Sequence, residues 1–124
     1  MPVIHASDSP THELPGARFT ALVGPRLGAR DTSVWCVELA AGGAPTLHEV
    51  TREEVFFILS GRARVTIAGV ESEALAGDAV LVPALTPFTI ECATDAPLRA
   101  LCCLPIGGQA RLPGGEPFTP PWAS

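Results

Sequence analysis

The sequence predicts an all-β protein with the architecture of an antiparallel β-barrel or jelly roll. Its 124 residues include 12 Gly and 13 Pro, a density that interrupts helices and favours turns. Apolar runs of strand length lie between these turns, and no helical period extends over a useful distance. Hydrophobic residues make up 47% of the chain, which is enough to bury a core. Short strands at close spacing are typical of antiparallel sandwiches and barrels.

Four strands are expected in the first half of the chain. Residues 18–23 alternate weakly and end at a turn with the sequence GPRLG. Residues 33–39 carry large apolar side chains at alternate positions, so one face of this strand is apolar. Residues 46–50 form a short strand between a Gly-rich turn and a polar turn. Residues 54–59, EVFFIL, are apolar on both faces, as a strand inside a barrel must be.

Five further strands are expected in the second half. They cover residues 64–68, 71–75, 79–82, 88–92 and 98–104. The first two are joined at Gly69-Val70, which has the form of a hairpin turn. The second is short and polar, as edge strands often are.

These strands divide the chain into a barrel and two flanking segments. The barrel is expected over residues 17–106. Residues 1–16 are polar, with three prolines and two histidines, and we expect an irregular N-terminal arm. Residues 107–124 are rich in Pro and Gly, and we expect a C-terminal tail packed on the barrel.

Composition excludes several partners and compartments. The net charge is -5 and Lys is absent, so the chain lacks the basic surface that nucleic-acid binding needs. Its apolar runs are far shorter than a membrane span, and no secretory signal precedes the strands. We therefore expect a cytoplasmic protein with reduced cysteines. Abundant Ala and Arg without Lys suggest a bacterial source.

A first motif spans the third and fourth strands. Five residues separate Gly42 from His48, Val50 stands two positions later, Glu54 follows after three residues, and Gly61 follows after six more. This spacing resembles the first motif of the cupin superfamily, Gly-x5-His-x-His-x3–4-Glu-x6-Gly, with Val50 in place of the second His.

A second motif follows in the next strands. Gly77 and Pro83 keep the places that they have in the second cupin motif, Gly-x5-Pro-x-Gly-x2-His-x3-Asn, whereas Leu85, Phe88 and Cys92 replace its Gly, His and Asn. The resemblance implies a small single-domain cupin with a degenerate metal site.

In metal-binding cupins, four motif residues converge on one divalent transition metal. The corresponding residues here are His48, Val50, Glu54 and Phe88. Val and Phe donate nothing, and one imidazole with one carboxylate leaves most of a coordination shell to water. No cofactor is therefore expected. The alternative is a metal held by His48 and Glu54, alone or with an inward-facing cysteine.

Three cysteines are relevant to that alternative. Cys92 lies four residues after Phe88 and shares its strand face, and one of Cys102 and Cys103 must also face inward. A thiolate binds Zn well. The simpler interpretation is that each is a small buried hydrophobe.

The motif residues are also the candidate catalytic groups. A carboxylate near an imidazole holds its tautomer and raises its basicity, and burial raises the pKa of a carboxyl group so that it can act as an acid. We therefore predict that His48 and Glu54 are catalytic. The alternative is that both are inherited ligands, hydrogen-bonded to each other or to water. The expected substrate-binding residues are Val50, Phe56, Phe88, Cys92 and Arg99.

These residues lead to a leading function and two alternatives. The leading hypothesis is metal-independent acid–base chemistry on a small organic molecule, such as isomerisation, cyclisation or elimination. The alternatives are a non-catalytic module that binds a small ligand and a metal-dependent cupin dioxygenase or hydrolase with an unusual ligand set. We also expect a homodimer, because an outward apolar face that carries Phe57 requires a cover.

Overall fold

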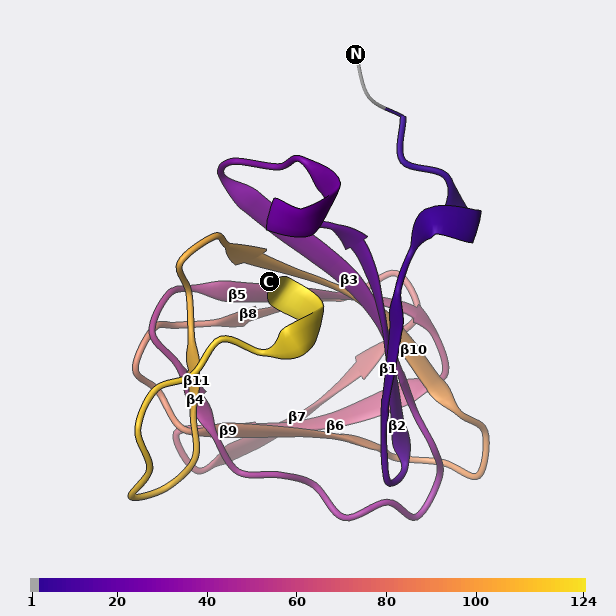
Figure 1. The fold of residues 1–124 in the computed structure, drawn as a ribbon. Helices are drawn as coiled ribbons and strands as arrows, with labels where there is room; N and C mark the ends of the chain where they lie inside the picture. Colours follow the sequence, from indigo (N-terminus) through magenta and orange to yellow (C-terminus); the bar gives the residue numbers. More distant parts are fainter. Residues whose placement is uncertain (1–2) are drawn as a thin grey trace.

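The computed structural model describes residues 3–124 and has the all-β, antiparallel architecture that the sequence predicts (Figure 1). The strands of this part of the chain are β1 (Thr11–Leu14), β2 (Ala17–Val23), β3 (Thr32–Leu39), β4 (Glu49–Val50), β5 (Glu54–Ser60), β6 (Arg62–Ile67), β7 (Val70–Leu75), β8 (Ala79–Val82), β9 (Phe88–Cys92), β10 (Leu98–Pro105) and β11 (Ala110–Arg111). Its helices are three short 3-10 turns, η1 (Ala6–Asp8), η2 (Pro25–Leu27) and η3 (Pro121–Ala123). None of these is long and apolar enough to cross a membrane.

The strands form two facing sheets and a short ribbon. The larger sheet has the order β1-β2-β3-β10-β5-β8, and the smaller has the order β7-β6-β9. Figure 1 shows the smaller sheet facing the larger one across the core, as in a jelly roll, with the β4–β11 ribbon at one end. The ribbon therefore connects the first motif, in β4, to the C-terminal tail, in β11.

The core follows from the alternation of strand residues. In β10, the side chains of Leu98, Ala100, Cys102 and Leu104 are almost fully buried, whereas Arg99 is exposed. Facing positions on the smaller sheet, such as Val65, are also buried. Each large side chain buried in this way contributes about 1.5–3 kcal/mol relative to exposure.

The N-terminal arm is more regular than we expected. Residues 11–14 form the strand β1, which pairs with β2 in the register Thr11↔Thr20 to Leu14↔Ala17. Gly16 lies in the connecting turn with φ +74°, a conformation that glycine adopts readily. The prediction of an irregular segment over residues 1–16 was wrong here, because a polar edge strand lacks the apolar alternation by which strands are recognised. Residues 1–2 lie outside the described part.

The C-terminal tail lies against the larger sheet and the β4–β11 ribbon. The Thr51 N–H donates to the Gln109 carbonyl at 2.8 Å, next to the β4–β11 ribbon. The Trp122 ring stacks on Phe19 with centroids 3.7 Å apart. Ser33 Oγ donates to the Ala123 carbonyl at 3.1 Å. In Figure 1 the yellow end of the chain consequently lies between β3 and the β4–β11 ribbon.

The strand expected over residues 46–50 is shorter than predicted. Strand pairing covers Glu49–Val50, and residues 41–47 form an exposed loop with two glycines and Pro45. His48 instead makes an isolated bridge to Phe88, at the start of β9. That bridge places the first and second motifs side by side.

Candidate functional site

His48 is held against Phe88 by both main chain and side chain. The His48 N–H donates to the Phe88 carbonyl at 3.2 Å, and the Phe88 N–H donates to the His48 carbonyl at 2.9 Å. Their ring centroids lie 4.4 Å apart, with an angle of 48° between the planes. The imidazole therefore has a fixed position beside an aromatic wall.

The tautomer of His48 follows from its hydrogen bond. Its Nδ1 lies 2.9 Å from the Thr46 carbonyl oxygen, which can only accept, so Nδ1 carries the proton. Burial lowers the pKa of His48 below its usual 6.5, although the bond to Thr46 acts in the opposite direction. At neutral pH the ring is therefore uncharged, and Nε2 carries the free lone pair of a base.

Glu54 is more deeply buried than His48. It begins β5, pairs with Val82 of β8, and is 4% exposed. Its Oε1 has no hydrogen-bond partner among residues 3–124. Desolvation raises its pKa from 4.5 to about 8, so at neutral pH the carboxyl group is mostly protonated and can donate a proton.

The structure does not join His48 and Glu54 as a hydrogen-bonded dyad. The Thr46 carbonyl, rather than Glu54, orients the imidazole. Phe88 is fully buried, and its ring contacts both the His48 ring and, at 5.9 Å, the Phe56 ring next along the inner face of β5. A phenyl ring thus lies between His48 and the inner face of β5.

The expected substrate-binding residues divide into two groups. Val50, Phe56 and Phe88 are 2%, 6% and 0% exposed and belong to the main core cluster. Cys92 and Arg99 lie away from His48. The Cys92 thiol donates to the Ala96 carbonyl at 2.8 Å, within the loop that follows β9.

Arg99, an expected substrate-binding residue, faces outward from the middle of the larger sheet. Its Nε lies 3.9 Å from Glu38 Oε1 on the neighbouring strand β3. The side chains of Leu98 and Ala100 on either side point inward, so strand alternation places Arg99 on the outer face.

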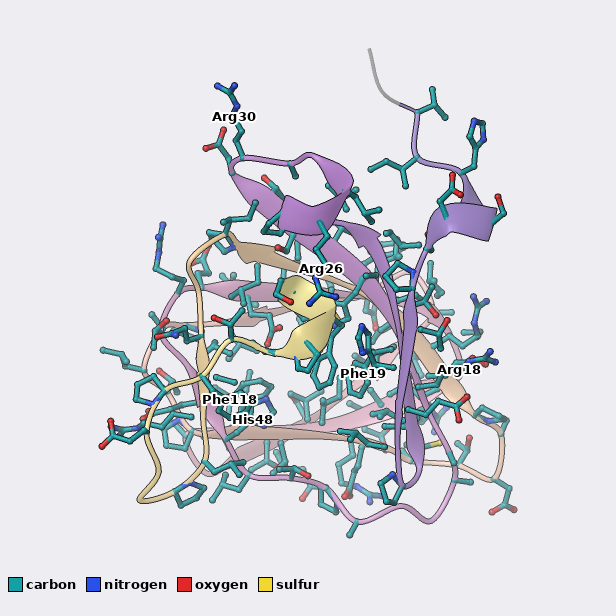
Figure 2. The ribbon with its side chains drawn as sticks, viewed as in Figure 1. Arg18, Phe19, Arg26, Arg30, His48 and Phe118 are labelled. Carbon is teal, nitrogen blue, oxygen red and sulfur yellow. The ribbon has the colours of Figure 1, made fainter. Side chains whose placement is uncertain are left out.

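A small cavity lies beside His48. Its volume is about 240 Å³, and Figure 2 labels His48 on the side of the molecule where the β4–β11 ribbon runs. The polar side chains of the cavity come from His48, Glu49 and Arg111, and its apolar surface comes from Leu47, Pro87, Leu112 and Pro113. Neither Glu54 nor the buried core residues line it. It is smaller than the roughly 300–1,000 Å³ of sites for drug-sized ligands, so a small ligand fits best.

Sequence reasoning missed two polar residues of this cavity, Glu49 and Arg111. They are cross-strand partners in the β4–β11 ribbon, and Arg111 Nη2 lies 2.6 Å from Glu49 Oε1. Glu49 lies between His48 and Val50, at the variable position of the His-x-His motif. Arg111 lies in a Pro/Gly-rich tail without a motif, so no local pattern connects the two residues.

A larger cavity, of about 400 Å³, lies elsewhere, along β6, β7 and β8. Its acidic side chains are already engaged: Asp78 accepts a hydrogen bond from the Leu75 N–H, and Glu73 lies 3.7 Å from Arg62. We therefore regard the smaller cavity, which contains an oriented base, as the candidate functional site.

Comparison with known families agrees with the motif spacing. Residues 35–104, more than half of the chain, match the family model of the cupin domain. The chain belongs to the cupin family. The matched residues include both motifs.

Individual cupins and relatives show how far the likeness extends. A curated protein of Methanocaldococcus jannaschii is 38% identical over 63 residues, and this cupin spans about half the length of that relative. The structure of the polyketide cyclase RemF from Streptomyces resistomycificus matches with a TM-score of 0.74 at 19% identity, over 85% of this chain and 79% of the cyclase. An oxalate decarboxylase from Lactobacillus farciminis matches with a TM-score of 0.71 at 25% identity, over 80% of this chain and 31% of the enzyme.

The metal of metal-binding cupins does not fit this donor set. Within residues 3–124 no three His, Cys, Asp or Glu side chains gather into a metal-binding group. Two positions that belong to histidine ligands in the cupin motifs hold Val50 and Phe88, whose apolar side chains are buried in the core. Cys102 faces inward, but burial raises the pKa of its thiol well above the usual value, which disfavours the thiolate that binds metals.

Proposed function

We propose that this cupin binds a small organic molecule in the cavity beside His48 and moves a proton on it without a metal. One observation carries the proposal: His48 lines the cavity as a neutral imidazole whose Nδ1–H is bound to Thr46. Its Nε2 is therefore ready to accept a proton at neutral pH.

The chemistry open to such a base is limited. Nε2 can take a proton from a carbon atom next to a carbonyl group and return it at another position of the same molecule, which is an isomerisation. Alternatively, the electron pair left on the substrate carbon can expel a leaving group or form the bond that closes a ring. In each case His48 cycles between its neutral and protonated forms, and no electrons are transferred to the protein.

Glu54 is the second titratable group of the proposal. Its carboxyl group is mostly protonated at neutral pH. Burial raises the pKa of Glu54, the acid, and lowers the pKa of His48, the base, so each is in the form that its role requires. Phe88 contacts His48 and is fully buried, and Glu54 does not line the cavity, so a catalytic role for Glu54 requires the Phe88 ring to move. A catalytic role for Glu54 therefore predicts that Glu54→Gln and His48→Gln reduce turnover to a comparable extent.

Comparison with known structures supports small-molecule chemistry in general. A polyketide cyclase and an oxalate decarboxylase share the fold, and the same scaffold thus serves different reactions in different proteins. The reaction proposed here depends on the residues of this cavity and not on those neighbours.

The second candidate function is a binding module without turnover. It is favoured by the position of Glu54, which is outside the cavity that His48 lines. Such a module would hold a ligand against the imidazole without a second proton-transfer group.

Turnover by His48 variants distinguishes the two. Small carbonyl and enol compounds are first screened for thermal stabilisation of the protein, and exchange of their protons with deuterated solvent is then followed by NMR. His48→Ala should lower the exchange rate by about 10²–10⁴-fold, the usual effect of losing a general acid–base group. Exchange at the wild-type rate refutes the proposal, and binding without exchange by the wild type favours the module.

We also propose a homodimer formed through the outer face of the larger sheet. Phe57 of β5 is 43% exposed and Leu81 of β8 is 56% exposed. The register Phe57↔Leu101 and Val55↔Leu81 places these side chains in one apolar patch across neighbouring strands. A two-fold axis through such a patch pairs it with itself.

A further inference from the structure

The function proposed above leaves two charged residues of the cavity unexplained. Glu49 and Arg111 face each other across the β4–β11 ribbon, immediately after His48. The Glu49 side chain is 14% exposed, whereas that of Arg111 is 48% exposed. Arg111 is therefore the member of the pair that an incoming ligand can reach.

Arg111 keeps hydrogen-bonding capacity in this arrangement. Its ion pair within residues 3–124 joins Nη2 to Glu49 Oε1. A guanidinium group carries five N–H donors in a planar fork, and two of them can bind both oxygens of a carboxylate at once. The other donors of Arg111 thus remain for an anionic group of matching shape.

The rest of the cavity is apolar. Leu47 and Leu112 line it and are 49% and 45% exposed. Pro87 and Pro113 add rigid apolar surface. Covering these side chains removes hydrocarbon from water, which favours a ligand with an apolar body.

We propose that the cavity selects a small monocarboxylate, whose carboxylate group binds Arg111 and whose hydrocarbon part covers Leu47 and Leu112. This inference rests on the proposed function, because it names the substrate class of the cavity in which His48 acts. The acid would lie with its carboxylate at the ribbon and its carbon skeleton toward the imidazole.

Glu49 has a definite part in this selection. Without a ligand it neutralises Arg111 and holds the guanidinium at the cavity. When a carboxylate binds, two anions share one cation and repel each other, which weakens binding. Removing the charge of Glu49 should therefore strengthen the binding of a carboxylate and leave a neutral ligand unaffected.

Benzoate and its neutral analogue benzamide separate charge from shape. Both are titrated by NMR into the wild-type protein and into Arg111→Gln, Glu49→Gln and Arg99→Gln. Arg99 is the matched control, because it also pairs with a glutamate across neighbouring strands, on the outer face of the larger sheet. Arg99→Gln thus corrects for the general effect of losing one positive charge.

The wild type should bind benzoate more tightly than benzamide. Arg111→Gln should weaken benzoate binding by about tenfold or more, as expected for a charge-assisted pair of hydrogen bonds, and leave benzamide binding unchanged. Glu49→Gln should tighten benzoate binding several-fold. Arg99→Gln should bind both compounds as the wild type does.

Three results would overturn the inference. They are the absence of benzoate binding by the wild type at tens of millimolar, wild-type benzoate affinity in Arg111→Gln, and equal losses in Arg111→Gln and Arg99→Gln. These results concern binding alone, so they leave the role of His48 in turnover intact. Conversely, wild-type turnover by His48→Ala would refute the proposed function without affecting the dependence of binding on Arg111.

Discussion

His48 and Phe88 form a reciprocal main-chain pair, with the two hydrogen bonds between them at 3.2 and 2.9 Å and their rings 4.4 Å apart. In the cupin motifs both positions belong to histidines. Here the first position keeps its imidazole, and the second holds Phe88, on whose ring His48 packs. This packing contributes to the burial that lowers the pKa of His48.

Restoring the lost ligands should restore metal binding. The double variant Val50→His/Phe88→His provides three imidazoles and Glu54 at the four motif positions, so its affinity for Zn²⁺ or Mn²⁺ should exceed that of the wild type by about 100-fold or more. Calorimetric titration at pH 7.5 measures this difference. The control Val50→Ala/Phe88→Ala removes the same side chains without adding donors, and equal affinity in the two double variants would contradict the prediction.

Glu54 should make the stability of the protein depend on pH. Because its pKa is raised from 4.5 to about 8 on folding, its contribution to stability is fully present below pH 4.5 and is lost as the pH rises through 8. Relative to Glu54→Gln, the wild type should therefore lose roughly 5 kcal/mol of unfolding free energy across this window. Urea unfolding at several pH values checks this, with the exposed neighbour substitution Glu53→Gln as control. A constant difference between wild type and Glu54→Gln would show that Glu54 titrates normally.

The motif glycine Gly61 should tolerate no side chain. It has φ +85°, and a Cβ atom there would lie 2.6 Å from the Pro97 carbonyl oxygen. Gly77 has φ +94° with no atom within 4 Å of such a Cβ. Both alanine variants carry the left-handed cost of about 1–2 kcal/mol, so Gly61→Ala should lose more stability than Gly77→Ala. Equal unfolding free energies of the two variants would refute this close approach.

The outer face of the larger sheet should hold the dimer together. A charge placed in an apolar interface is costly, so Phe57→Glu and Leu81→Glu should shift the protein toward monomer in light scattering. Val70→Glu, at an exposed position of β7 in the other sheet, should leave the mass unchanged. A monomeric wild type at micromolar concentration would reject the proposal.

The sequence was sufficient for the fold because the signals of a strand are local. In β10, the apolar run from Leu98 to Leu104 predicted the strand, but it left open which of Cys102 and Cys103 faces the core and did not place Arg99 on the outer face. Motif spacing added the resemblance to the cupin family, which the family model confirms. The strand β1 was missed because Thr11–Leu14 is polar, and its pairing with β2 leaves no pattern in the sequence.

The site was less predictable because it depends on contacts between residues that are far apart in the sequence. The resemblance to cupins implied that His48 and Glu54 take inward positions, but it does not show that the Phe88 ring packs against His48. Arg111 reaches Glu49 because the tail folds back on β4, a pairing of residues about sixty positions apart in a segment without strand periodicity. The sequence predicted that Glu54 orients the imidazole of His48, whereas the Thr46 carbonyl does so in the structure.

The protonation state of His48 decides whether the cavity holds a base. The chain has three histidines, so their ¹⁵N signals can be resolved by long-range ¹H–¹⁵N NMR and assigned with His48→Gln. At pH 7 we expect His48 to be neutral, with the proton on Nδ1 and the lone pair on Nε2, and to titrate below pH 6.5. A doubly protonated ring at pH 7, or a neutral ring with the proton on Nε2, would contradict the proposed role of His48 as the base.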